Sequence, residues 1–140
     1  MLKIKENPPR TVVTLEWNAD DVGKAFAAQF KGVSTPVFDD ISRFADGGLG
    51  DPFVLSKITY DGKMVGVSAG RARDFYHNNM ISLAFLDTKL AEEGKELSVI
   101  WGTDPKTAMP IRVKVAAFPY YNEEYRNETF DVEKIPHPVF

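Results

Sequence analysis

The 140-residue chain contains no cysteine, and this absence excludes two kinds of stabilisation. Neither a disulfide framework nor a zinc site with thiolate ligands can form. Histidine is almost as scarce, because the sequence holds just His77 and His137, 60 residues apart. A metal site needs several nitrogen or carboxylate ligands that converge, so we expect no bound metal.

Long apolar runs are missing as well, since no stretch approaches the ~20 residues that cross a bilayer. The N-terminus, Met1 to Arg10, carries three basic residues and just two large aliphatic ones, so it lacks the apolar core of a signal peptide. Basic charge is not in excess either, because 17 Lys and Arg against 20 Asp and Glu give a formal net charge of -3. These absences predict a cytoplasmic protein that binds neither nucleic acid nor membranes.

The sequence does contain short periodic apolar segments, with 44% hydrophobic residues, which is material for one domain core. From Thr11 to Trp17 every second residue is apolar, which predicts a strand with one buried face. The period then changes to four at Val22, Phe26 and Phe30, behind a capping Asn18. This spacing predicts a helix over about residues 19–31.

Strand patterns dominate the rest of the chain. Asp61-Gly62 is a typical two-residue hairpin turn, and it separates strands expected at 53–60 and 63–69. Three further alternating segments predict strands at 81–87, 96–101 and 111–118, with one helical turn over 88–94. Six short strands and one helix indicate a mainly β fold, either an antiparallel barrel or a sandwich.

Two segments lack such patterns. Residues 32–52 are rich in glycine and proline, which predicts a long loop anchored by a few apolar side chains. Residues 122–140 are expected to form an extended tail, either wrapped loosely on the body formed by residues 10–121 or swapped onto a neighbouring chain. We therefore expect a single domain, 1–140.

Several motifs in the strand region occur together in one known family. "DGKMVGVSAG" at 61–70 is followed after ten residues by "ISLAFLD" at 81–87, then by "LAEEGKEL" at 90–97 and "FPYY" at 118–121. In this order and spacing they resemble the C-terminal barrel of the glycine-cleavage T-protein (aminomethyltransferase) family. The resemblance covers about residues 53–121 and implies a six-stranded antiparallel barrel.

Within that family, "TVVTLEWN" at 11–18 and "PYYNEEYRNETFDVEKIP" at 119–136 look most like aromatic O-demethylases of the vanillate, 3-O-methylgallate and syringate type. The resemblance implies transfer of a methyl group to tetrahydrofolate by a three-domain protein. It places the acid-base residues in the first two domains, which do not precede Met1. We therefore expect no catalysis by this chain alone and assign it no catalytic residues. One motif departs from the family, since Arg73-Asp74-Phe75 stand where many relatives have "Y-S-P".

Two groups of residues are candidates for contact with the folate cofactor. Arg71 and Arg73 are cations that can pair with the carboxylates of a folate glutamyl tail, with Tyr76 and His77 beside them in the loop expected after the hairpin. Tyr121 and Arg126 form the second group, because the resemblance implies that the end of the barrel approaches the glutamyl tail of the folate. The candidate cofactor-binding residues are therefore Arg71, Arg73, Tyr76, His77, Tyr121 and Arg126. In both groups the plainer interpretation is favoured, namely a solvated loop and an aromatic seal on the barrel.

Two hypotheses about function remain open. In the first, the chain is one module of a folate-dependent demethylase and works with N-terminal catalytic domains or a subunit of the same family. This hypothesis predicts an exposed apolar face. In the second, the barrel is a stand-alone binding or structural module that forms a homodimer and does not use folate. Trp17 and Trp101 are expected in the core in either case.

Overall fold

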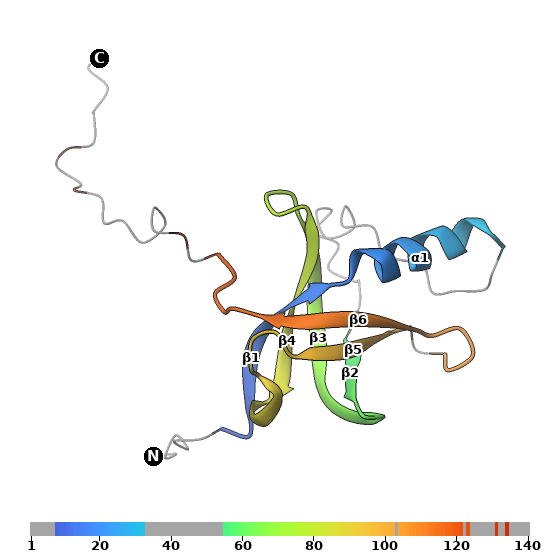
Figure 1. Ribbon diagram of the computed structural model, residues 1–140, viewed down its shortest axis with the longest axis horizontal. Helices are drawn as coiled ribbons and strands as arrows, with labels where there is room; N and C mark the ends of the chain where they lie inside the picture. The colour runs from blue at the N-terminus through green and yellow to red at the C-terminus, as the bar shows by residue number, and fades with distance from the viewer. Residues whose placement is uncertain are drawn as a thin grey trace, which may run out of the picture.

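The computed structural model describes residues 8–32, 55–102, 104–121, 123, 131 and 134, which form a β-barrel with one α-helix (Figure 1). The elements in chain order are β1 Arg10–Trp17, α1 Ala19–Phe30, β2 Ser56–Tyr60, β3 Lys63–Asp74, β4 Asn79–Asp87, the short 3-10 helix η2 Thr88–Leu90, β5 Glu96–Trp101 and β6 Met109–Ala116. The strands pair antiparallel in the closed order β1-β4-β3-β2-β5-β6. The predicted six-stranded antiparallel barrel with an N-terminal helix is confirmed, and the sandwich alternative is wrong.

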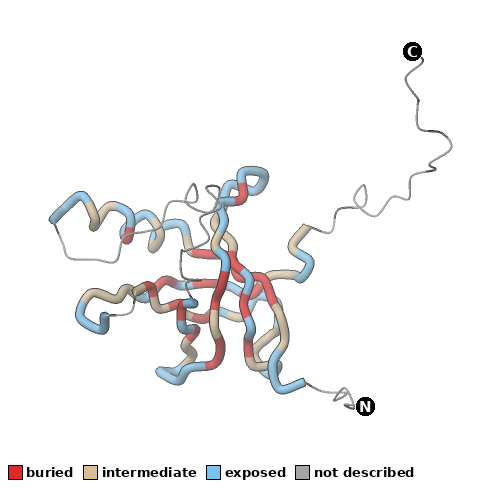
Figure 2. Tube along the Cα trace, turned by 180° about the vertical axis from the view of Figure 1, so that it is seen from behind, coloured by how far each residue is buried: buried red, intermediate tan, exposed pale blue. Residues whose placement is uncertain are grey.

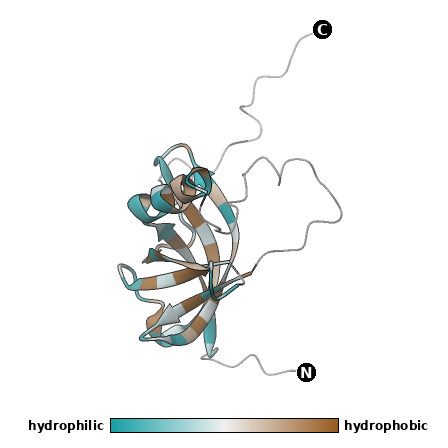
Figure 3. Ribbon diagram, turned by 90° about the vertical axis from the view of Figure 1, so that its right-hand side faces the viewer, coloured by the Kyte–Doolittle hydropathy of each residue, from teal (hydrophilic) through white to brown (hydrophobic). Residues whose placement is uncertain are grey.

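The core lies inside the barrel, where alternate residues of each strand meet. Figure 2 shows the buried positions concentrated on the strands, and Figure 3 shows hydrophobic and hydrophilic positions alternating along them. Trp17 and Trp101 are 4% and 3% exposed, so their predicted place in the core is confirmed. The largest side chains that are almost fully buried are Leu15, Ile58, Leu86, Ile111 and Val99.

A chain of polar groups crosses part of this interior. The indole Nε1–H of Trp17 donates to Ser82 Oγ at 2.9 Å, and Ser82 Oγ lies 2.8 Å from Ser68 Oγ. All three residues are buried. Because a buried donor without an acceptor is costly, these bonds favour the register in which β1, β4 and β3 meet at this level.

Helix α1 is fixed to the barrel at its first turn. Asn18 caps it by accepting a hydrogen bond from the backbone N–H of Asp21 at 3.1 Å, and Arg112 of β6 holds the Asp21 carboxylate from the other side. From there α1 runs outward (Figure 1), so Ala25 is its one buried residue. Phe26 and Phe30, on the apolar face that the spacing of four indicated, are 53% and 77% exposed.

Strand β3 is longer than the sequence predicted. A bulge between Ala69 and Arg71 lets it continue to Asp74, with Gly70 in a left-handed conformation at φ 58°. Arg71 and Arg73 were expected in a loop and instead belong to this strand, because the pairing with β4 resumes after the bulge. The helical turn predicted at 88–94 is confirmed in its first part, since η2 spans Thr88–Leu90. The expected loop over 32–52 and tail over 122–140 lie almost wholly outside the described residues. Within the described part, no helix is both long and apolar enough to cross a membrane.

Candidate functional site

The hairpin between β3 and β4 presents a turn built on Asp74. Its Oδ1 accepts a hydrogen bond from the backbone N–H of Tyr76 at 2.9 Å, and Asn78 completes the turn in a left-handed conformation at φ 55°. A short polar side chain that bonds to the backbone two residues on is a common way of fixing such turns. The turn therefore holds Tyr76 and His77 at the end of the two strands.

The Asp74 carboxylate is the centre of this site. Its side chain is 2% exposed, His77 Nδ1 lies 2.6 Å from its Oδ2, and the Tyr121 hydroxyl donates to its Oδ1. Burial by itself raises the pKa of Asp74, but the hydrogen bonds from Tyr121, His77 and the Tyr76 backbone outweigh burial and lower that pKa from 3.8 to about 2. Asp74 is thus ionised at neutral pH and accepts hydrogen bonds, so His77 Nδ1 is the donor in the bond between them.

Tyr120 joins the same region to β1 and β4. Its hydroxyl accepts from Asn79 Nδ2 at 2.7 Å and donates to Glu16 Oε1 at 2.9 Å. Burial, together with the bond to Glu16, raises the pKa of Tyr120, while the bond from Asn79 opposes this shift. The residues that follow β6 are therefore held to the outer surface of two other strands.

Four rings pack in a compact group, mostly edge to face, which we call the tyrosine cluster (Tyr76, His77, Tyr120 and Tyr121). Ring centroids lie 4.9 Å apart for Tyr76 and His77, 5.3 Å for His77 and Tyr120, and 5.5 Å for Tyr120 and Tyr121. In the described part of the chain, two carboxylates lie against it, that of Asp74 and that of Glu123, whose Oε1 lies 3.9 Å from His77 Nε2. The cluster therefore suits a planar ring or a hydrogen-bond donor better than an anion.

The two arginines among the predicted residues have other surroundings. The Arg71 guanidinium lies 3.3 Å from the centroid of the Trp101 ring and 5.8 Å from that of Trp17. Arg73 lies over the ring of Phe75 at 4.8 Å and is exposed. The structure thus brings Tyr76, His77 and Tyr121 together, whereas Arg71 lies over Trp101 and Arg73 over Phe75. The sixth predicted residue, Arg126, lies outside the described residues.

A groove of about 410 Å³ adjoins the cluster on the outside of the barrel. Its floor comes from the outer surfaces of β1, β3 and β4, and its wall from residues 118–121. Volumes from about 300 Å³ upward are typical of small-molecule sites. Its main apolar lining residues are Ala72, Ile81, Leu83, Phe118 and Pro119.

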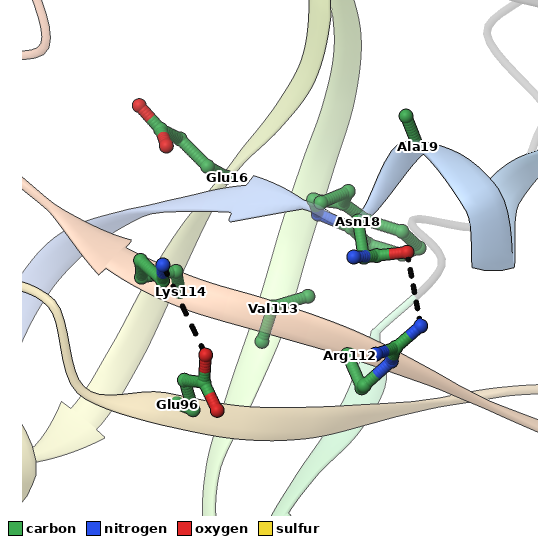
Figure 4. Close-up of a pocket in the computed structure, with 8 residues that line it drawn as sticks. Glu16, Asn18, Ala19, Glu96, Arg112, Val113 and Lys114 are labelled. Carbon is green, nitrogen blue, oxygen red and sulfur yellow. Dashed lines mark hydrogen bonds and ion pairs between the residues drawn. The ribbon is translucent and has the colours of Figure 1, made fainter.

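A second pocket, of about 290 Å³, lies between the start of α1 and β6 (Figure 4). Its cations are already paired within the chain. Arg112 donates through Nε and Nη2 to both carboxylate oxygens of Asp21 at 2.8 Å, and Lys114 Nζ lies 3.9 Å from Glu96. The hydrogen bonds from Arg112 lower the pKa of Asp21 to about 2. These contacts anchor α1 to β6, so this pocket is better explained as structure than as a ligand site.

Four contributors to the site are not among the residues predicted from the sequence, namely Asp74, Tyr120, Glu16 and Asn79. The spacing of three between Asp74 and His77 across a turn was a usable local signal. The roles of Glu16 and Asn79 depend on partners 104 and 41 residues away, which no local pattern reveals. Within the described residues, no group of three or more His, Asp or Glu could hold a metal ion.

Known proteins are similar to this chain over most of its length, although no family model matches it. It is 39% identical over 133 residues to the sesamin methylene transferase of Sinomonas sp. (strain No.22), a match that covers 91% of this chain and 29% of that protein. It is 30% identical over 99 residues to the syringate O-demethylase of Sphingobium sp. (strain NBRC 103272 / SYK-6), covering 56% of this chain and 21% of that protein.

The chain thus spans less than a third of the length of these relatives. The first match includes nearly the whole barrel, and the barrel has the architecture that the motifs implied. The resemblance recognised in the sequence, to the glycine-cleavage T-protein family and in particular to its aromatic O-demethylases, is therefore confirmed.

Proposed function

We propose that this chain is the barrel module of a tetrahydrofolate-dependent transferase that removes methyl or methylene groups from aromatic ethers. The observation that carries the proposal is the 39% identity over 91% of the chain to a methylene transferase of which it spans 29%. In this proposal the barrel supplies one wall of a composite site, and the acid-base chemistry belongs to the remainder of the transferase. When bound, tetrahydrofolate accepts the one-carbon unit.

The described residues fit part of this cofactor. The apolar groove and the ring of Tyr121 suit the planar part of a folate, and the carboxylates of Glu16 and Glu123 suit its N–H donors. The glutamyl tail needs cations, and Arg73 is the exposed cation among the predicted residues of β3. Arg71 is less suited because its guanidinium already lies on the Trp101 ring. A partial fit agrees with a site that other domains complete.

Calorimetric titration of tetrahydrofolate tests the proposal. One sample is the 140-residue chain, and the other is full-length sesamin methylene transferase in which the matching segment is exchanged for this chain; we call this protein the chimera. We expect binding and one-carbon transfer by the chimera and no binding by the chain alone. Arg73→Gln should weaken binding to the chimera, whereas Lys57→Gln, an exposed cation of β2, should not. A chimera that neither binds folate nor transfers a one-carbon unit would refute the proposal.

A second function is favoured by a specific observation, the exposure of Leu83, Phe85 and Phe118 at 48%, 49% and 56%. An apolar surface of this kind also suits a barrel that pairs with a copy of itself and does not use folate. Light scattering on the purified chain separates the two. A stable dimer, together with an inactive chimera, would favour this second function.

A further inference from the structure

One flank of the barrel is apolar on its outside. An antiparallel strand with one wet face normally carries polar residues there. On β4, however, Leu83 and Phe85 point outward, and each is about half exposed, at 48% and 49%. The residues beside Phe85 in the register are Val12 of β1 and Val67 of β3, both partly exposed. The three neighbouring strands therefore share an apolar outer surface.

The groove described above continues this surface. Leu83 and Ile81 lie on the same outer face of β4 and line the groove, whose opposite wall includes Phe118, 56% exposed. We call the whole region the apolar flank (Val12, Val67, Ile81, Leu83, Phe85 and Phe118). A surface with both an exposed apolar area and a hollow can receive a protruding side chain, which is how the central anchors of protein interfaces bind.

The adjacent flank of the barrel has the opposite character. Across β1, β6 and β5 the outward residues Glu16, Lys114 and Glu96 face one another in register, with Arg112 next along β6. The side chains of Lys114 and Glu96 are 55% and 80% exposed, and their ammonium and carboxylate lie 3.9 Å apart. Such a charged, internally paired surface is suited to water. The apolar surface of β4 therefore does not continue onto this neighbouring flank.

We propose that the apolar flank is the surface on which the remainder of the homologous transferase polypeptide packs. This inference rests on the proposed function. In the sesamin methylene transferase, the matching segment is 29% of the polypeptide, so most of that protein lies outside it and requires a contact surface on the barrel. A stable interface needs about 800 Å² from each partner. The face of β4 and the groove together form a continuous surface, and they adjoin the tyrosine cluster that would complete the composite site.

The test places positive charge on the flank of the chimera. Leu83→Lys and Phe85→Lys are combined in one variant, and Phe26→Lys on α1, where the wild-type side chain is 53% exposed, is the matched control. Melting of the isolated 140-residue chain, followed by circular dichroism, shows first whether each variant folds. Because the replaced side chains are half exposed, we expect the isolated barrel to keep its melting temperature within about 5 °C.

In the chimera, calorimetry should show one cooperative transition with the native flank and two with the double variant, one of them at the temperature of the isolated chain. One-carbon transfer should fall by about tenfold or more in the double variant and remain unchanged in the Phe26→Lys control. These results would support the proposal. An active chimera whose double variant still melts as one unit would overturn this inference and leave the proposed function standing. A native chimera that melts in two transitions and has no activity would overturn both.

Light scattering on the isolated chain gives a further decisive result. A dimer that forms with the native flank and dissociates in the Leu83→Lys and Phe85→Lys variant would show that a second copy occupies the surface, which would overturn the proposal.

Discussion

Gly66 of β3 lies so close to β4 that even one methyl group does not fit. A Cβ added at Gly66 would lie 2.4 Å from the carbonyl oxygen of Phe85 and 3.1 Å from the Cα of Leu86. Both are backbone atoms, so no side-chain rotation relieves the contact. Since real Cβ atoms stay at least 3.0 Å from such neighbours, the strands must separate by about 0.6 Å or more at this point.

The cost of Gly66→Ala follows from three contributions. Overpacking costs about 1–3 kcal/mol, and the distorted ladder between the strands about 1 kcal/mol more. The smaller backbone entropy of alanine in the unfolded chain offsets about 0.4–1 kcal/mol. We therefore expect the free energy of unfolding to fall by about 1–3.5 kcal/mol, measured by urea denaturation with fluorescence of the buried Trp17 and Trp101.

Gly23→Ala is the matched control, because no atom lies within 4 Å of its added Cβ. It occupies an open position in α1, where alanine is favoured over glycine by about 0.5–1 kcal/mol. This variant should therefore be as stable as the wild type or slightly more so. If Gly66→Ala unfolds at the same urea concentration as the wild type, the close approach of β3 and β4 is wrong.

Three further predictions follow from the polar contacts. Ser82→Ala should lower the free energy of unfolding by about 1–3 kcal/mol, because the buried indole N–H of Trp17 loses its acceptor; an unchanged urea midpoint would contradict this. Tyr121→Phe removes a donor and should raise the pKa of Asp74 from about 2, as measured by carboxyl NMR titration. The pKa of Asp74 in the folded protein lies below the unfolded value of 3.8, so the stabilisation from ionised Asp74 is present above about pH 4 and is lost as the pH falls from about 4 to 2. The Tyr121→Phe variant should lose less stability over this pH range than the wild type. Arg112→Ala should speed amide hydrogen exchange in α1 while β6 stays protected, because Arg112 binds the Asp21 carboxylate at the first turn of the helix. Exchange in α1 at the wild-type rate would argue against this attachment.

Much of the fold was predictable because its signals are local. The alternation in β1 and the Asp61-Gly62 turn each depend on a few neighbouring residues, and both are confirmed. The end of β3 was not predictable, because the sequence predicts a strand over 63–69, whereas Gly70 forms a bulge and the strand continues to Asp74. A bulge depends on the partner strand, and the sequence of β3 alone does not show whether pairing resumes.

The helix face illustrates the same limit. Spacing of four correctly predicted α1 and the apolar face shared by Val22, Phe26 and Phe30, yet Phe26 and Phe30 are exposed. Periodicity shows which residues share a face, but not what covers that face. Here the contacts of Asp21 with Asn18 and Arg112 fix the first turn of α1 to the barrel, and the later turns extend away from it.

The candidate site was predictable as a set of residue types but not as an arrangement. Closing the barrel pairs β1 with both β6 and β4, and this pairing brings the residues after β6 beside the β3–β4 hairpin. Tyr121 consequently reaches Asp74 across 47 residues of sequence, and Tyr120 reaches Glu16 across 104. The same closure directs the alternate residues of β4 outward, where Leu83 and Phe85 adjoin the groove at the tyrosine cluster. A change that opened the barrel between β1 and β6 would therefore disrupt the cluster and the groove together, whereas a charge on the apolar flank should leave the barrel itself folded.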